Sequence, residues 1–215
     1  MIQQNDFIEL EFTGKADGVV FDTTDKEVAN KEGIVSKKAE YGPMLICVGQ
    51  GHVLKGLDDA IAGQEIGKAF TVSLAPEKAF GKKSAKLVQL IPQRKFVEHQ
   101  INPFPGLQVN IDNQIGLVKT SSGGRVLVDF NHPLSGKSIE YHAKIVKKVD
   151  DDAQKVRGYL KLILGFDAKV AVQEGKATAA LPFELPKEVH EEMSKKVKEL
   201  IPAIKDIAFT HEKKE

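Results

Sequence analysis

VGQGHVLKGLDDAI, residues 48–61, places three glycines in a short apolar stretch that leads from a predicted strand into a predicted helix. Glycine turns before a helix often bind phosphate, because the helix N-terminus presents free N–H groups. Neither nucleotide motif matches, since a dinucleotide fingerprint reads G-x-G-x-x-G and a P-loop has a lysine directly after its last glycine. Gly49, Gly51 and Gly56 have neither spacing, and Leu57 follows the last of them. Carboxylates in the first helical turn would also repel a phosphate, so the stretch does not indicate nucleotide binding.

Alternating apolar and polar residues, typical of half-buried strands, flank this stretch on both sides. The spacing of Leu54, Leu57 and Ile61 predicts a short helix with one apolar face, and Gly63 can end it. Residues 25–40 are polar and rich in lysine, which predicts a solvent loop. Strands are predicted over residues 8–12, 18–24, 44–48, 69–75 and 138–149.

The composition of the chain changes at about residue 85, where prolines become frequent. Two alternating segments, 116–120 and 125–130, flank the turn signal Gly123-Gly124, which predicts a small all-β module. The strand over 138–149 then resumes the earlier pattern, so the chain is expected to leave one domain and return to it.

Three consecutive aspartates, residues 150–152, mark the next boundary. Leucines alternate over 158–165 and predict a strand, and a hairpin is predicted about Glu174-Gly175. The clearest helix is predicted over 186–201, followed by a last strand over 205–212. A unit of about 65 residues has a marginal core by itself, so a docking or dimerisation domain is expected.

Composition excludes several classes of function. The chain has 215 residues and a formal net charge of +1, so no strong field draws it to nucleic acid or to an anionic membrane. Its one cysteine, Cys47, rules out an internal disulfide framework and favours a reducing compartment. The sequence contains neither a signal-peptide pattern nor an apolar run of about 20 residues, so a cytoplasmic protein is expected.

The sequence shows no motif for nucleophilic or metal-dependent catalysis. The six histidines are scattered without ligand spacing, so neither a metal nor a cofactor is predicted. No serine lies in a G-x-S-x-G turn, and Cys47 has no basic neighbour. What remains is a set of apolar and aromatic residues on strands and on the short helix. By periodicity alone, this set is either the core or a ligand pocket.

Three ordered motifs favour the pocket. FDTTD (21–25), the long run from Pro43 to Lys68, and APEKAFG (75–81) follow one another as similar runs do in the FKBP-type peptidyl-prolyl isomerases, which the chain resembles. An insertion after Gly81, with a return through NHPLSGK (131–137), resembles the SlyD-like branch, in which an insert-in-flap chaperone domain interrupts the isomerase domain.

This resemblance implies an α+β protein: an antiparallel sheet wrapped on a short helix, an inserted small all-β domain, and a C-terminal α+β domain like that of long-chain archaeal relatives. The expected boundaries are 1–84 and 131–149 for the isomerase domain, 85–130 for the insert, and 150–215 for the C-terminal domain, a candidate dimerisation or docking unit. The histidine-rich metal-binding tail of some SlyD proteins is absent.

Position by position, the resemblance implies a proline pocket without a cofactor. Leu57 stands where many relatives carry tryptophan, and Phe12 and Phe80 stand where they often carry tyrosine, so two hydroxyls are missing. Asp22 is the one charged member and is expected to act by orientation and local electrostatics. The implied catalytic set is Phe12, Asp22, Val53, Leu54, Leu57, Phe80 and Tyr141, and Phe21, Met44 and Leu134 are implied to bind substrate.

The insert is expected to hold unfolded chain near this pocket. Six of its apolar residues could present a binding surface or instead pack the insert's own core: Leu90, Ile91, Phe96, Val97, Ile101 and Phe104. The implied function is isomerisation of X–Pro bonds in unfolded or nascent polypeptides, with chaperone activity. Two alternatives stay open, a holdase without isomerase activity and a ribosome-associated adaptor that works through residues 151–215.

Overall fold

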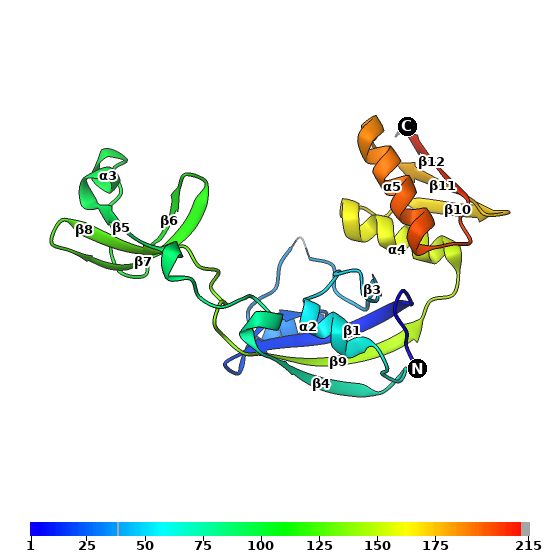
Figure 1. Ribbon diagram of the computed structural model, residues 1–215, viewed down its shortest axis with the longest axis horizontal. Helices are drawn as coiled ribbons and strands as arrows, with labels where there is room; N and C mark the ends of the chain where they lie inside the picture. Colours follow the sequence, from blue (N-terminus) through cyan, green and yellow to red (C-terminus); the bar gives the residue numbers. More distant parts are fainter. Residues whose placement is uncertain (38, 212–215) are drawn as a thin grey trace. The chain divides into compact units, whose positions relative to one another are not determined.

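The structure is a computed structural model that describes residues 1–37 and 39–211. Its elements form an α+β fold with mainly antiparallel sheets and few helices, which confirms the predicted class (Figure 1). The chain divides into two compact units, which are described separately. The first comprises Met1–Leu74 and the chain from Ile139 onward, and the second comprises Ala75–Ser138.

The first unit is built on a five-stranded antiparallel sheet in the order β2-β1-β9-β4, with β3 paired to β1. β1 and β2 form the predicted hairpin, because Asp17 and Gly18 adopt the positive φ angles that its tight turn needs. β9 follows the second unit in the chain and lies between β1 and β4. The strands are β1 Phe7–Ala16, β2 Val19–Thr23, β3 Met44–Cys47, β4 Ala69–Leu74 and β9 Ile139–Lys148.

A short helix, α2 (Lys55–Ile61), packs its apolar face into the core of this unit. Leu57 and Ile61 are completely buried, and each such side chain contributes about 1.5–3 kcal/mol of burial free energy. Gly63 follows with a φ of 86°, a left-handed conformation that allows the chain to leave the helix.

The prediction of a plain loop over 25–40 is wrong in one part. Residues Lys26–Lys31 form a helix, α1, because the Asp25 side chain caps it by accepting hydrogen bonds from the Glu27 and Val28 N–H groups at 2.7 and 3.2 Å. Lys38, inside the predicted loop, lies outside the described residues.

The second unit contains a four-stranded antiparallel sheet in the order β5-β8-β7-β6. Gly123 and Gly124 turn β7 into β8 with positive φ angles, as predicted. One face of the sheet packs against a helix, α3 (Gln93–Glu98), which the all-β prediction missed. The strands are β5 Val88–Pro92, β6 Gln108–Ile111, β7 Gln114–Ser122 and β8 Arg125–Asp129, and two short 3₁₀ helices precede them, η1 Pro76–Lys78 and η2 Ala85–Leu87.

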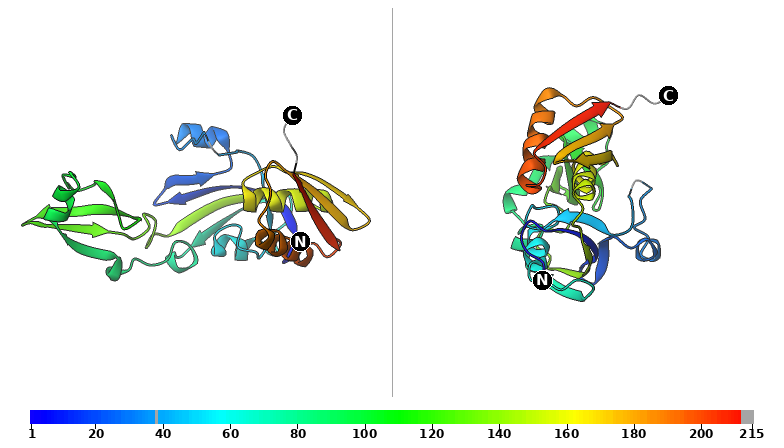
Figure 2. Two further views of the ribbon diagram at one scale, coloured as in Figure 1. Left: turned by 90° about the horizontal axis from the view of Figure 1, so that it is seen from above. Right: turned by 90° about the vertical axis from the view of Figure 1, so that its right-hand side faces the viewer.

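The C-terminal part contains two helices and a three-stranded sheet in the order β10-β11-β12. β10 (Lys169–Gln173) and β11 (Lys176–Leu181) form the predicted hairpin, whereas β12 (Asp206–His211) runs parallel to β11. The helix predicted over 186–201 is α5 (Lys187–Leu200), which lies beside β12 (Figure 2). Glu212, the end of the predicted last strand, lies outside the described residues.

The strand predicted over 158–165 is wrong, because these residues belong to a helix, α4 (Asp152–Leu164). Asp151 caps it by accepting a hydrogen bond from the Gln154 N–H at 2.7 Å. Val156, Tyr159 and Leu160 are spaced three and four residues apart and are buried together, so the apolar face follows the helical period.

The core of the C-terminal part continues into the first sheet. Phe7 of β1 and Cys47 of β3 belong to the same cluster of buried residues as Val156, Tyr159 and Leu160 of α4. The C-terminal elements therefore pack onto the back of the sheet within one compact unit.

Candidate active site

Three aromatic side chains meet on one face of the first sheet. The Tyr141 ring of β9 lies edge-on to the Phe12 ring of β1, with ring centroids 5.6 Å apart, and to the Phe21 ring of β2, at 6.0 Å. Phe12 and Tyr141 are buried, whereas Phe21 is half-buried. Edge-to-face pairs of this kind contribute about 0.5–1.5 kcal/mol each beyond their burial. The structure thus brings together three of the predicted pocket residues.

Gly14 makes this arrangement possible. It pairs with Tyr141 across β1 and β9, and a Cβ atom at this position would lie 2.7 Å from Tyr141 Cε1 and 2.9 Å from Phe21 Cζ. Only glycine lets the two rings approach the strand so closely. Sequence reasoning missed Gly14, although a glycine inside an alternating strand is the expected sign of such an approach.

Asp22 follows Phe21 on β2, and part of its side chain is open to solvent. Desolvation raises the pKa of its carboxyl group, while a hydrogen bond from the Thr23 N–H acts in the opposite direction. Burial, and next the charge of Asp22, raise the pKa of the Tyr141 phenol. Tyr141 is therefore a neutral hydroxyl at every physiological pH, and the negative charge of Asp22 acts on it.

The remaining predicted residues of this unit come from β3 and from the segment around α2. Met44 pairs with Leu10 on the sheet, and Val53 and Leu54 are half-buried just before α2. Leu57, the predicted floor of the pocket, is completely buried, so little of its surface is left to contact a ligand.

Asp58 holds the turn in which Gly49 and Gly51 adopt the positive φ angles that favour glycine. Its two carboxylate oxygens accept hydrogen bonds from the Gly49 and Gly51 N–H groups, at 2.7 and 2.9 Å, and the side chain is buried. The N–H groups that a phosphate would need are thus already bound by a carboxylate of the same chain. Sequence reasoning placed Asp58 at the helix dipole and missed this role.

Phe80 and Leu134 lie in the second unit. The Phe80 ring stacks on the His132 imidazole, with ring centroids 4.6 Å apart and planes 3° from parallel. Ser135 Oγ donates a hydrogen bond to the Phe80 carbonyl oxygen at 3.0 Å, and the Leu134 N–H donates to His132 Nδ1 at 3.2 Å. His132 is a second residue that sequence reasoning missed, since its partner comes from a segment about 50 residues earlier.

The six apolar residues predicted in the insert divide into two groups. Ile91 and Phe96 are buried in the insert's own core, and Ile101 packs against it, so these three do not form an exposed surface. Leu90, Val97 and Phe104 are exposed over 53–62% of their area.

The insert's sheet has a second, open face. Leu90 of β5 pairs with Leu127 of β8, on the opposite side of the strand from the buried Ile91. By the same alternation, Val88 of β5 and Ile115 and Leu117 of β7 are exposed on the face turned away from the core. We call Val88, Leu90, Ile115 and Leu117 the open face of the insert.

The single cysteine is structural. Cys47 is completely buried, its thiol donates a weak hydrogen bond to the Asn5 carbonyl oxygen at 3.6 Å, and burial raises its pKa to about 12. Over residues 1–37 and 39–211, no group of three or more histidine, cysteine, aspartate or glutamate side chains is placed to hold a metal ion. None of the helices in this part of the chain is long and apolar enough to span a membrane.

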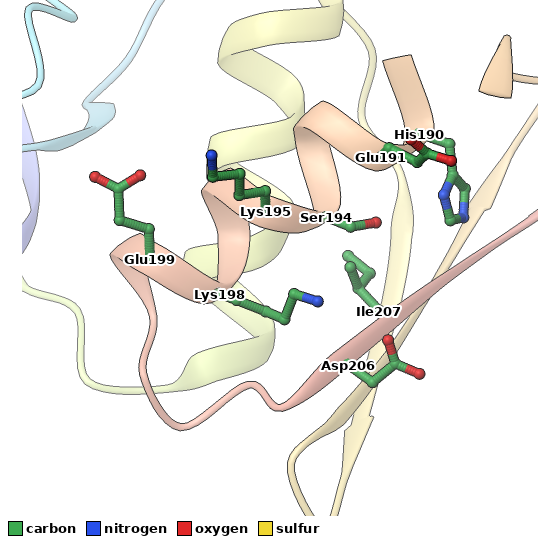
Figure 3. A pocket seen from close by; sticks show the side chains of 8 residues that line it. All are labelled: His190, Glu191, Ser194, Lys195, Lys198, Glu199, Asp206 and Ile207. Carbon is green, nitrogen blue, oxygen red and sulfur yellow. The ribbon is translucent and has the colours of Figure 1, made fainter. Parts of the chain in front are cut away.

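A cavity of about 570 Å³ lies between α5 and β12 (Figure 3). Its lining includes Ile207 and Ser194, whose hydroxyl is buried without a hydrogen-bond partner. Charged groups of both signs surround it, among them Lys198 and Asp206. It holds none of the residues predicted from the sequence.

The first unit is thus an α+β domain with aromatic side chains gathered on one face of its sheet. Comparisons with known proteins identify its family. A model of the FKBP-type peptidyl-prolyl cis-trans isomerase family matches residues 1–102, and a model described as the FKBP26 IF domain matches residues 89–134. The chain is 30% identical over 145 residues to the short-type peptidyl-prolyl cis-trans isomerase of Methanocaldococcus jannaschii, which covers 67% of this chain and 92% of that one.

Bacterial isomerases are also similar to this chain. The FKBP-type 16 kDa peptidyl-prolyl cis-trans isomerase of Escherichia coli is 27% identical over 150 residues, covering 68% of this chain and 93% of that one. The isomerase SlyD of Helicobacter pylori is 29% identical over 109 residues, covering 48% and 58%. The chain belongs to the family of FKBP-type peptidyl-prolyl cis-trans isomerases.

Proposed function

We propose that the residues gathered around Tyr141 bind a proline side chain and catalyse rotation about the preceding peptide bond. The observation that carries this proposal is the aromatic group Phe12, Phe21 and Tyr141 beside Asp22. Met44, Val53, Leu54 and Leu57 complete the wall within this unit. The roles that the resemblance implies for Phe80 and Leu134 stay predictions.

The pocket needs no nucleophile, because no covalent bond forms or breaks. Rotation about an X–Pro bond passes through a twisted amide, which has lost its resonance, and the barrier is about 20 kcal/mol. The twisted amide is less polar than the planar one, so an apolar site that excludes water favours it over the ground state. Aromatic side chains hold the ring while the preceding carbonyl group turns.

Asp22 contributes an oriented negative charge at the edge of this apolar site. Its raised pKa indicates incomplete solvation, so its charge acts on a bound amide more strongly than it would in water. The matched test is Asp22→Asn, which keeps the shape and removes the charge. We expect kcat/KM on a proline tetrapeptide to fall about tenfold, equivalent to about 1.4 kcal/mol. Turnover equal to that of the wild type would refute the role of Asp22, and an inactive wild type would refute isomerase activity itself.

We further propose a chaperone function for the insert, as in the SlyD-like branch. Seven of the fourteen large hydrophobic side chains exposed in the described chain lie between residues 75 and 138. Concentrated exposed apolar area of this kind marks a binding surface for other chains. Unfolded polypeptide held there would have a raised effective concentration at the pocket.

The test separates binding from catalysis. A variant with Leu90→Ser and Ile115→Ser on the open face should retain tetrapeptide turnover, yet catalyse the refolding of a proline-limited protein at least tenfold less efficiently. Val19→Ser is a matched control, because Val19 is as exposed but lies in the first unit. Equal losses in both assays, or none in refolding, would contradict the proposed division of labour.

The insert can also be removed as a whole. Ser84 and Asn131 join its two ends by hydrogen bonds of 2.8 and 3.1 Å, so a direct connection between them spans a short distance. Deletion of residues 85–130 should therefore preserve the first unit and reproduce the loss in refolding. A homodimer through residues 150–215 and a cytoplasmic location stay predictions, and sedimentation velocity of the full chain tests the first.

A further inference from the structure

β3 lies between two sets of buried residues. Met44 and Ile46 point to the face of the sheet that carries Phe12, since Met44 pairs with Leu10. Leu45 and Cys47 point to the other face and join the buried cluster that contains α4. The strand that precedes the glycine turn is thus held from behind by the C-terminal part of the chain.

The Leu45 side chain of β3 packs directly against the backbone of α4 at Gly158. A Cβ atom on Gly158 of α4 would lie 2.4 Å from Leu45 Cδ2 and 2.7 Å from Leu45 Cδ1. Any side chain larger than hydrogen at position 158 would therefore displace Leu45 or the helix. A glycine inside a helix costs about 0.5–1 kcal/mol relative to alanine, so this close approach offsets a local cost.

His52 connects the glycine turn to the same helix. Its Nδ1 accepts a hydrogen bond from the Cys47 N–H at 3.0 Å, and this bond closes the turn on itself. Its ring faces the Tyr159 ring of α4, with centroids 6.1 Å apart. On the other side of the turn, Asp58 binds the N–H groups of Gly49 and Gly51. Val53, a predicted pocket residue, comes directly after His52.

We propose that α4 is a positioning element of the isomerase pocket, and that His52 is the positioning residue that transmits the location of α4 to Val53 and Leu54. This inference rests on the proposed function of these two residues. It gives the C-terminal part a role in the turnover of short peptides, separate from docking or dimerisation.

The protonation state of His52 offers a specific readout. Burial lowers the pKa of His52; the charge of Asp58 acts against this shift and that of Lys196 adds to it. Cys47 and Tyr159 also face the ring, and both stay neutral because their pKa values are raised. Only a neutral imidazole can accept the Cys47 N–H, so acidification below the lowered pKa must break the bond.

The first experiment compares two substitutions of His52 in the full chain. His52→Asn retains an acceptor oxygen near the place of Nδ1, and His52→Leu removes it. We expect kcat/KM on a proline tetrapeptide to fall about tenfold for His52→Leu and to stay within about threefold for His52→Asn. The ratio of wild-type activity to that of His52→Asn should decline as the pH falls below the lowered pKa of His52. Asp22 is present in both, so its titration cancels in the comparison.

The second experiment displaces the helix and then restores it. Gly158→Ala should lower kcat/KM, and Leu45→Ala combined with Gly158→Ala should recover it, because the smaller side chain makes room for the added methyl group. Ile163→Ala is the control, since Ile163 lies on the same helix but is exposed. Wild-type turnover in both Gly158→Ala and His52→Leu would overturn the inference. An inactive wild type would instead overturn the proposed function, so the two failures are distinguishable.

Discussion

Gly14 lies beneath the rings of Phe21 and Tyr141, and its replacement by alanine is a sharp test of the pocket. The added Cβ would be 2.7 Å from Tyr141 Cε1 and 2.9 Å from Phe21 Cζ, well inside van der Waals contact, so at least one ring must move. Overpacking of this kind costs about 1–3 kcal/mol, and replacing a strand glycine by alanine recovers about 0.5–1 kcal/mol. The net expectation is a loss of about 0.5–2 kcal/mol of stability, or a fall in Tm of about 1–8 °C.

The effect on activity should exceed the effect on folding. A ring displaced from the pocket changes the surface that grips proline, so we expect kcat/KM on a tetrapeptide to fall at least about tenfold at a temperature where the variant is fully folded. A protease-coupled peptide assay measures the rate, and circular dichroism confirms that the chain is folded under the assay conditions.

Gly116→Ala provides the matched control. A Cβ atom there would lie 2.5 Å from Val128 Cγ1 and 2.8 Å from Phe130 Cδ1, an equally tight contact within the sheet of the second unit. This variant should lose stability while it retains tetrapeptide turnover. Full activity in Gly14→Ala, or equal losses in the two variants, would refute the assignment of the aromatic group as the pocket.

Three further predictions concern ionisable groups. Asp58→Asn should destabilise the chain by about 1.5–3 kcal/mol in urea unfolding, because a buried charge-assisted hydrogen-bond pair is weakened, whereas the exposed Asp59→Asn should change stability by less than about 0.5 kcal/mol. Asp22→Asn should raise the urea midpoint at pH 7 but not at pH 3. A carboxyl whose pKa is raised on folding begins to cost stability as the pH rises past its unfolded-state pKa, and costs most above its folded-state pKa, so an equal shift at both pH values would contradict the desolvation of Asp22. Cys47, with its pKa raised to about 12, should react with iodoacetamide at pH 8 only after unfolding, and rapid labelling of the native chain would show that the thiol is exposed.

Local pattern was sufficient for most of the fold. The alternation of β1, the helical spacing of Leu57 and Ile61, and the Gly123-Gly124 turn each depend on neighbours in the chain, so the sequence predicts them directly. α4 was misread as a strand because Leu160, Leu162 and Leu164 alternate. Its helix is decided by a cap at Asp151 and by the burial of Val156, Tyr159 and Leu160 against β1 and β3, which are more than 100 residues away.

The candidate site also has one part that the sequence indicates and another part that only the structure reveals. The resemblance to a known family implied which aromatic residues belong to the proposed pocket, and the structure brings the rings of Phe12, Phe21 and Tyr141 together. The sequence by itself determined the short buried helix and the absence of a nucleotide motif, since these rest on period and spacing. It determined the class of fold through its resemblance to a known family.

Only the tertiary structure decided which side chains contact Gly14, Gly158 and the glycines of the turn. Asp58 occupies the N–H groups of the turn, Gly14 admits two rings, and Gly158 admits Leu45. Each of these depends on an atom that comes from another element, at a distance that no pattern in one segment encodes. Side-chain contacts across elements, unlike periodicity within one, are fixed only when the chain has packed.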